Sequence, residues 1–287
     1  MIKKGIILAG GLGTRMSPLT KAVNKQLLPI YDKPLIYYPL SILMLAGIKD
    51  VLIIVNKGQL NQFRKLLPEK NNLGIKIQYK EQAKPRGLPE AFILGEKFIS
   101  KDKVALILGD NFFYGQSLTS KLKQSVKLNK GAKVFLHPVK NASAYGVAKI
   151  DKNNKIQKII EKPKKLFSNL AVTGLYFFDN NVIKLSKSLK LSKRKELEIT
   201  DLLNIYRKKN NLKAEFIGRG GTWLDTGNIS DFYDTSNYVS TLEKRQGLKI
   251  ACLEEIALKN KWIGKAEIHK SIKFYGDCEY SRYLKNL

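Results

Sequence analysis

Predicted strands alternate with segments of helical pattern through the first 110 residues of the chain, and this alternation constrains the fold more than any other feature. The expected strands are residues 4–9, 51–55, 75–80 and 104–108. The expected helices between them are residues 34–46, 59–67 and 88–99. Strands alternating with helices form parallel βαβ units, and continuously apolar strands are covered on both faces. The pattern therefore predicts an α/β fold with a doubly wound, mostly parallel, Rossmann-like sheet and helices on both faces.

The pattern changes beyond about residue 138. The elements expected there are a hairpin formed by residues 145–150 and 155–161, a strand over 172–178, and helices over 198–209 and 229–245. The chain from residue 246 to its end is mostly helical in pattern. We expect one α/β domain over residues 1–245, in which an added β region occupies about 139–245, followed by a helical C-terminal segment over 246–287.

The chain carries a formal net charge of +28, from 52 basic and 24 acidic residues. Such an excess can indicate binding to nucleic acid or to a membrane surface. Only 8 of the basic residues are arginine, and the 44 lysines are spread along the chain without a basic tail or stripe. An even spread favours a solvated surface. We therefore expect no nucleic-acid or membrane partner, although the charge should attract anionic small molecules.

The two cysteines, Cys252 and Cys278, stand in no CxxC motif and near no cluster of metal-binding residues. Two thiols in 287 residues fit reduced cysteines better than a disulfide framework. The apolar run over residues 6–9 is too short for a signal peptide or a membrane span. These features predict a cytoplasmic protein.

A glycine-rich loop follows the first predicted strand, in the string Leu8-Ala-Gly-Gly-Leu-Gly-Thr-Arg15. Glycines allow backbone N–H groups to approach a polyphosphate closely, and Arg15 adds positive charge. The loop is not the dinucleotide fingerprint, because Met16 stands where a third glycine is required, and no GK[ST] follows as in a P-loop. The alternative interpretation is a tight strand-to-helix turn.

Two aspartates are candidate metal ligands. Asp110 follows the predicted strand over 104–108, and Asp225 lies in the string Trp223-Leu-Asp-Thr-Gly227. Ligands of open α/β sheets bind beyond the carboxyl ends of the strands, where a carboxylate can hold a hard cation. The alternatives are a helix N-cap for Asp110 and a turn for Asp225.

The combination of Gly10-Gly-Leu-Gly-Thr-Arg15 with Lys25-Gln-Leu-Leu-Pro29 resembles the nucleoside-diphosphate-sugar pyrophosphorylases. The string Tyr37-Tyr-Pro-Leu-Ser41 is similar to the thymidylyltransferase branch of that family. The resemblance extends over nearly the whole chain. It implies that dTTP and glucose 1-phosphate react to dTDP-glucose and pyrophosphate with Mg²⁺ as cofactor. It also implies a homotetramer and feedback inhibition by a dTDP-deoxysugar.

The resemblance also assigns roles to individual residues, and divides the α/β domain into a nucleotide-binding part and, from about residue 139, a sugar-phosphate-binding part. The residues implied to bind the nucleotide are Leu8, Gly10, Gly11, Gly13, Thr14, Arg15, Lys25, Gln82, Gly87 and Asp110. Those implied to bind the sugar phosphate are Tyr145, Gly146, Glu161, Lys162, Val172, Arg194 and Trp223. The residues implied to be catalytic are Arg15, Lys25, Lys162, Asp110 and Asp225, of which the two aspartates hold Mg²⁺.

One loop departs from the family pattern. The family usually has Pro-Asp-Gly-Leu-Ala-Gln where this chain has Pro85-Arg-Gly-Leu-Pro-Glu90. The change at Arg86 reverses a charge next to Gly87, in the loop that is implied to read the base. Gln82 and Gly87 are retained, so the prediction of base binding stands. Asn24 and Lys195 also replace residues that are usual in the family.

The implied chemistry needs no general base, because the attacking phosphate oxygen is already an anion. The residues have only to position the reactants and neutralise charge at the α-phosphorus. The same reaction with UTP or another nucleotide is one alternative. A non-catalytic sugar-nucleotide-binding protein is a second, and a nucleic-acid-binding protein, suggested by charge alone, is a third.

Overall fold

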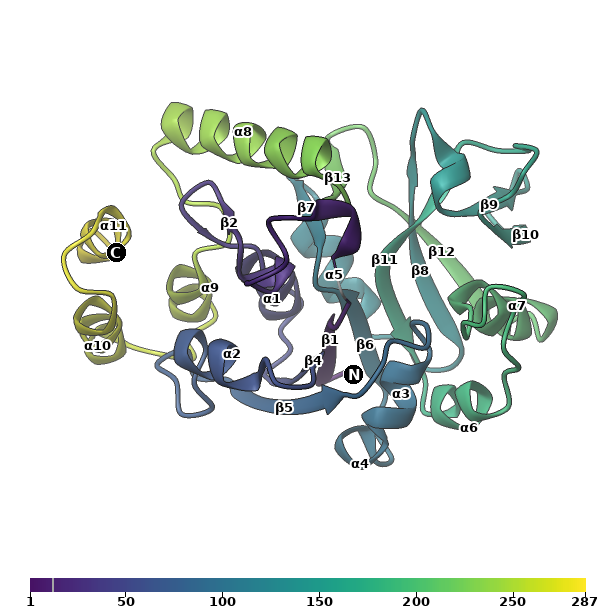
Figure 1. Ribbon diagram of the computed structural model, residues 1–287, viewed down its shortest axis with the longest axis horizontal. Coiled ribbons are helices and arrows are strands. Elements are labelled where there is room, and N and C mark those ends of the chain that lie inside the picture. Colours follow the sequence, from purple (N-terminus) through teal and green to yellow (C-terminus); the bar gives the residue numbers. More distant parts are fainter. Residues whose placement is uncertain (12) are drawn as a thin grey trace.

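The computed structural model describes residues 1–11 and 13–287 (Figure 1). Nine strands form the main sheet: β1 (Lys4–Ala9), β4 (Asp50–Asn56), β5 (Lys76–Gln82), β6 (Val104–Leu108), β8 (Ala132–Pro138), β9 (Gly146–Ile150), β10 (Ile156–Glu161), β11 (Leu170–Phe178) and β12 (Leu212–Phe216). Two small ribbons lie beside it, β2 (Pro29–Ile30) with β3 (Lys33–Pro34), and β7 (Asn111–Gly115) with β13 (Gly221–Asp225).

The helices are α1 (Tyr37–Leu45), α2 (Leu60–Leu66), α3 (Glu90–Leu94), α4 (Glu96–Ile99), α5 (Leu118–Ser125), α6 (Asn181–Lys187), α7 (Ile199–Lys208), α8 (Ile229–Gln246), α9 (Leu253–Lys259), α10 (Lys265–Tyr275) and α11 (Glu279–Lys285). Three short 3-10 turns cover Thr14–Met16, Lys25–Leu27 and Ala142–Ala144.

The main sheet is parallel where the sequence predicts βαβ units. Strands run in the order β10-β9-β11-β6-β1-β4-β5, and the pairs β6–β1, β1–β4 and β4–β5 are parallel. Strand β11 pairs antiparallel with β6, β8 and β9, and joins the hairpin β9–β10 to the parallel part. The predicted α/β class is confirmed, with a mixed sheet that carries the added β region at one end.

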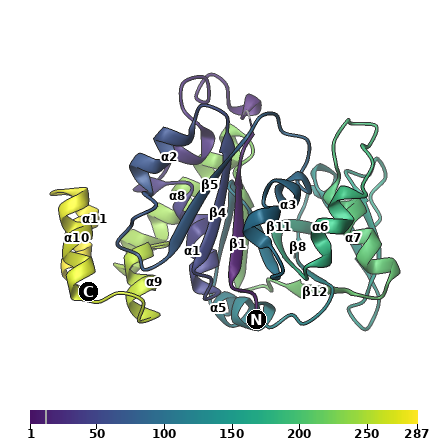
Figure 2. The same ribbon diagram turned by 90° about the horizontal axis from the view of Figure 1, so that it is seen from below.

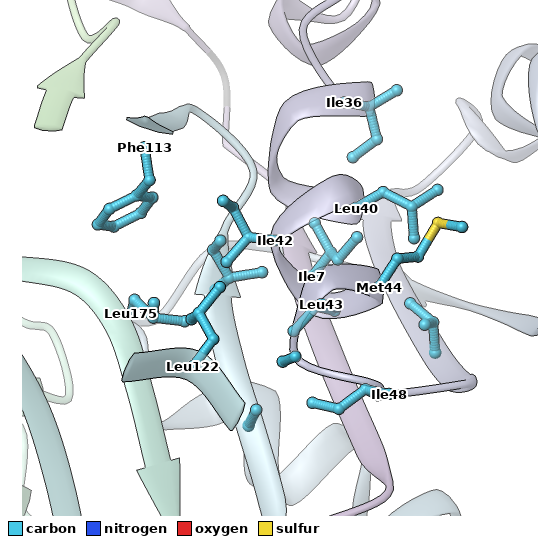
Figure 3. Close-up of a cluster of buried hydrophobic side chains, with 14 of the residues drawn as sticks. Ile7, Ile36, Leu40, Ile42, Leu43, Met44, Ile48, Phe113, Leu122 and Leu175 are labelled. Carbon is cyan, nitrogen blue, oxygen red and sulfur yellow. The ribbon is translucent and has the colours of Figure 1, made fainter. Parts of the chain in front are cut away.

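Helices cover both faces of the sheet, and successive residues of a strand point to opposite faces. In β1, Ile7 packs in a cluster with α1, α5 and α9, whereas Ile6 packs on the other face with α3, α6 and α7. Figure 3 shows Leu43 of α1 beside Ile7, with Leu175 of β11 in the same cluster. Strands covered on both faces need apolar side chains at every position, which explains the continuous apolar runs.

The prediction of one continuous helix over 88–99 is wrong. The chain forms α3 and α4 there, separated at Gly95, and glycine is a poor residue for a helix interior. A side chain at Gly95 would lie 3.0 Å from Cδ1 of Ile6, so the close approach of this helix pair to β1 depends on glycine. The predicted helix over 34–46 begins later, at Tyr37, because Lys33 and Pro34 pair in the β2–β3 ribbon.

The chain after α8 is helical, as predicted. Helix α9 packs against α1. The pair α10–α11 lies beyond α9, at the edge of the molecule farthest from the added β region (Figures 1 and 2). None of the helices within the described residues has the length and apolar character to cross a membrane.

Candidate active site

A cavity of about 720 Å³ opens beyond the carboxyl ends of β1, β5 and β6. This is the edge at which open α/β sheets bind ligands. The predicted site residues that line it are Leu8, Gly10, Gly11, Arg15, Gln82, Gly87, Asp110, Tyr145, Gly146, Glu161, Lys162, Val172, Arg194, Trp223 and Asp225. The structure therefore brings together residues that lie up to 217 positions apart in the chain.

Three predicted residues do not line the cavity. Gly13 and Thr14 follow the lining part of the glycine loop; Gly13 adopts a left-handed conformation with φ 58°, and Thr14 is exposed. Lys25 is buried beneath the cavity floor, and its Nζ is 2.7 Å from Oδ2 of Asp110. Lys25 therefore contacts the site through Asp110.

The glycine loop is held by a group of amide side chains that the sequence did not reveal. Asn56, at the end of β4, accepts a hydrogen bond from the N–H of Gly11 at 3.0 Å and donates to its carbonyl oxygen at 2.9 Å. The amides of Asn24 and Asn56 both donate to Oε1 of Gln59. Asn24, a departure from the family pattern, is thus part of the support for the loop. These contacts fix the backbone of Gly11 at the cavity wall.

Asp110 and Asp225 are brought together by the ribbon β7–β13, in which Asp225 pairs with Asn111. Burial raises the pKa of Asp225 to about 7, and the charge of Asp110 acts in the same direction. Burial also acts to raise the pKa of Asp110, but the Lys25 ammonium and hydrogen bonds from Lys25 and Asn111 outweigh it and hold that pKa below its ordinary value. Two partly buried carboxylates that repel each other favour a bound cation between or beside them.

These two aspartates fit a divalent ion that takes its remaining ligands from a substrate. In the described ranges, 1–11 and 13–287, no group of three or more His, Cys, Asp or Glu side chains could hold a metal by itself. Mg²⁺ usually takes one or two carboxylates and completes its shell with substrate phosphates and water. The donor set of the site matches that pattern.

Asn111 is a site residue that sequence reasoning missed. Its Oδ1 accepts hydrogen bonds from Nε1 of Trp223 at 2.7 Å and from the backbone of Gly174 at 3.0 Å, and its Nδ2 donates to Oδ1 of Asp110 at 3.0 Å. It is buried, and it also lines the cavity. The amide of Asn111 thus orients both the candidate metal ligand Asp110 and the ring of Trp223. Its place directly after Asp110 was the only signal in the sequence.

The aromatic wall consists of Trp223, in β13, and Tyr145, which directly precedes β9. The rings of Trp223 and Tyr145 lie 5.0 Å apart between centroids at an angle of 64°. At the end of the neighbouring strand β10, burial and the nearby Glu198 raise the pKa of Glu161. An Arg194 nitrogen lies 3.4 Å from Oε1 of Glu161. This part of the cavity offers ring faces, carboxylates and a guanidinium, the groups that bind sugars and their phosphates.

Another part of the cavity wall is formed by Gln82, the last residue of β5, and by the loop that contains Gly87. Gly87 has φ 105°, and a Cβ there would lie 2.1 Å from the carbonyl oxygen of Leu197. Only glycine fits this position, so the loop can pass against the residues before α7.

The parallel sheet, the clamped glycine loop and the paired carboxylates at one cavity are typical of α/β enzymes that act on phosphorylated nucleotides. A family model described as nucleotidyl transferase matches residues 4–241. The chain belongs to this family, and it is a nucleotidyltransferase enzyme.

Individual relatives cover almost the full chain. A glucose-1-phosphate thymidylyltransferase of Neisseria meningitidis serogroup A is 48% identical over 99% of this chain and 99% of its own length. The enzyme of the same name from Mycolicibacterium smegmatis is 46% identical over 99% of this chain and 98% of its own length. The resemblance to this branch of the family is thereby confirmed.

Solved structures share the fold. A Bacillus anthracis protein assigned as a glucose-1-phosphate thymidylyltransferase superposes with a TM-score of 0.76 and 38% identity, over 82% of this chain and 94% of its own. A UDP-glucose pyrophosphorylase in complex with UDP-glucose superposes with a TM-score of 0.74 and 29% identity, over 84% of this chain and 100% of its own.

Proposed function

We propose that this enzyme joins glucose 1-phosphate to the nucleotidyl group of dTTP, forming dTDP-glucose and releasing pyrophosphate. The observation that carries the proposal is the near-complete alignment, at 44–48% identity, with relatives named for this reaction. The cavity supports it, because phosphate-binding and sugar-binding features occupy one continuous space.

The side chains around the cavity suit an in-line displacement at the α-phosphorus. The glycine loop, clamped at Gly11 by Asn56, presents backbone to the triphosphate. Arg15 lies near Asp225: a Cβ on Gly227 would lie 2.8 Å from Arg15 Nη2 and 3.2 Å from the Asp225 carboxylate. Its guanidinium can neutralise charge on the equatorial oxygens and on the departing pyrophosphate.

Asp110 and Asp225 would hold Mg²⁺, which would supply positive charge to offset that of the phosphates. Lys25 keeps Asp110 ionised and in place through their 2.7 Å ion pair. On the sugar side, Tyr145, Gly146 and Glu161 would contact hydroxyl groups, and Lys162 and Arg194 would bind the phosphate. The attacking oxygen is an anion, so no residue has to remove a proton.

Pyrophosphate release with a panel of nucleoside triphosphates and sugar 1-phosphates tests the proposal directly. The proposed function requires fastest release with dTTP and glucose 1-phosphate. UTP is the second candidate nucleotide, because a UDP-glucose pyrophosphorylase has the same fold. A protein that binds both substrates without releasing pyrophosphate would be the non-catalytic alternative.

Replacing Gln82 with alanine should reduce the preference for pyrimidine over purine triphosphates. Gln82 is buried at the end of the cavity assigned to the base, and losing a hydrogen bond there costs about 1–3 kcal/mol. Thymine and uracil differ by one methyl group, worth roughly 1 kcal/mol, so dTTP should exceed UTP only modestly. The measurement is kcat/KM for dTTP, UTP, CTP and ATP. If the preference for dTTP and UTP over ATP were unchanged in the variant, Gln82 would not read the base.

Duplex DNA should bind weakly, and the binding should disappear at moderate salt, because the lysines are spread over the whole chain and form no recognition element. Titration of labelled duplexes of two unrelated sequences, at low and at physiological salt, measures this. Tight, sequence-dependent binding at physiological salt would instead support the nucleic-acid-binding alternative.

The homotetramer and the feedback inhibition by a dTDP-deoxysugar remain proposals that rest on the resemblance. Exposed apolar side chains on α8 and α10, Tyr233 and Phe274, are consistent with contacts between subunits.

A further inference from the structure

A buried glutamate, Glu90, holds the side chain of Gln82 in one orientation. Gln82 ends β5 and Glu90 begins α3, and they are 3% and 9% exposed. Nε2 of Gln82 donates a hydrogen bond to Oε2 of Glu90 at 2.5 Å. A carboxylate offers only acceptors, so the NH₂ group of the Gln82 amide has to face Glu90. The amide oxygen therefore faces the other way.

That oxygen, Oε1 of Gln82, lies at the cavity wall beside the glycine loop. A Cβ placed on Gly10 would be 2.4 Å from it, and Gly10 and Gln82 both line the cavity. From the part of the chain that the structure describes, residues 1–11 and 13–287, no group donates a hydrogen bond to Oε1. Oε1 of Gln82 is thus a hydrogen-bond acceptor at the cavity wall.

Glu90 is itself fixed by the loop that carries Gly87. The same Oε2 accepts a hydrogen bond from the backbone N–H of Arg86 at 3.0 Å, and Nε of Arg86 lies 3.5 Å from Oε1 of Glu90. Arg86 and Glu90 are the two charged residues by which this loop departs from the family pattern, and they contact each other. Glu90 therefore cannot turn away from Gln82 without leaving both the Arg86 backbone and its counter-charge.

We propose that Glu90 is a positioning residue that sets base specificity by presenting Gln82 to the nucleotide as a hydrogen-bond acceptor. The inference rests on the proposed function, in which Gln82 contacts a pyrimidine. Thymine and uracil carry an N3–H donor between two carbonyl groups, whereas N3 of cytosine is an acceptor. Placed opposite N3, the fixed oxygen of Gln82 can accept a hydrogen bond from thymine or uracil, whereas it faces a lone pair on N3 of cytosine. Glu90 thereby admits thymine and uracil nucleotides and excludes cytosine nucleotides.

The test compares dTTP with dCTP, which have the same sugar and triphosphate, in the wild type and in Glu90→Met. The wild type should favour dTTP in kcat/KM by about 10²-fold or more, because a site built around a hydrogen bond strongly rejects a base that cannot form it. In Glu90→Met the amide of Gln82 is free to rotate and offer its NH₂ group to cytosine. The dTTP-to-dCTP ratio should then fall by about tenfold.

Two further variants separate positioning from support of the fold. Glu90→Gln keeps an acceptor of the same shape and should keep the ratio within roughly threefold of the wild type. Glu96→Gln removes the charge of an exposed glutamate in the adjacent helix α4, which pairs with Lys187 at 2.6 Å, and should leave the ratio unchanged. If Glu90→Met lowers kcat/KM for both nucleotides equally, Glu90 only supports the Arg86 backbone and the inference is wrong.

The wild-type enzyme provides a test that does not depend on a variant that folds. Use of dCTP and dUTP with kcat/KM values within about threefold of each other would overturn the inference, because a fixed acceptor has to distinguish them. Failure of the proposed function has a different signature. The wild type would then release no pyrophosphate from dTTP and glucose 1-phosphate, and the inference would fail with it.

Discussion

Asp110→Asn should lower kcat by on the order of 10² or more, and Asp225→Asn should do the same, while both variants remain folded. Each aspartate supplies one carboxyl group to a site that has to hold a cation against phosphate oxygens. Asp110 also pairs with Lys25 at 2.7 Å, so its loss leaves a buried ammonium beneath the cavity without its partner. Steady-state pyrophosphate release across a range of Mg²⁺ concentrations measures the effect, and a raised Mg²⁺ requirement identifies its cause.

A suitable control is Asp102→Asn. Asp102 also pairs with a lysine, Lys4, at 2.8 Å, but its side chain is 61% exposed and lies at the opposite edge of the sheet from the cavity. This variant should keep the wild-type rate. If Asp110→Asn or Asp225→Asn also kept a rate near that of the wild type with Mg²⁺, the substituted residue would not be a metal ligand.

The elements that the sequence predicted well are those whose pattern depends on burial alone. Strand β1 is apolar at successive positions because Ile6 and Ile7 face different helix layers. The observed β1, β4 and β6 match the predicted strands within one residue at each end. The ribbon β7–β13 was not predicted, because its two strands are short and lie more than a hundred residues apart. No local pattern specifies which distant segment pairs with which.

The motifs of the candidate site could be predicted from the sequence. The contacts that support those motifs could not. The glycine loop, Asp110 and Gln82 can be recognised in the sequence, whereas the amide of Asn111 and the carboxylate of Glu90 look like ordinary polar residues next to them. Their importance comes from burial and from partners on other elements. A polar residue that is buried has to find hydrogen-bond partners, so its role is fixed by tertiary structure.

The interpretation of the lysines as a solvated surface has exceptions, among them Lys25 and Lys33. Lys25 is 6% exposed and Lys33 is 3% exposed. Nζ of Lys33 pairs with Asp32 and lies 2.9 Å from Oε1 of Glu243, near the end of α8. Lys249 pairs with the same two carboxylates. Two ammonium groups and two carboxylates thus form a neutral buried cluster that joins the β2–β3 turn, α8 and the segment before α9.

Lys33→Met should reduce the free energy of unfolding by about 3–5 kcal/mol, which is the usual cost of breaking a buried ion pair by removing one partner. The variant leaves two largely buried carboxylates with one ammonium, and the uncompensated negative charge is poorly solvated. Chemical denaturation measures the loss. Lys187→Met is the matched control, because Lys187 and its partner Glu96 are each about half exposed, and the loss there should stay below about 1 kcal/mol.

A double variant shows whether the effect comes from charge or from packing. Lys33→Met combined with Glu243→Gln restores the neutrality of the cluster, so it should be more stable than Lys33→Met alone, although each change by itself is destabilising. If the losses of unfolding free energy in the two single variants simply add, the effect of Lys33→Met comes from packing of the methionine and not from charge. A loss below about 1 kcal/mol in Lys33→Met itself would mean that water or the remaining lysine compensates the carboxylates. In the expected case, the basic composition of the chain contributes to its stability at this cluster, because there the charge is buried and paired.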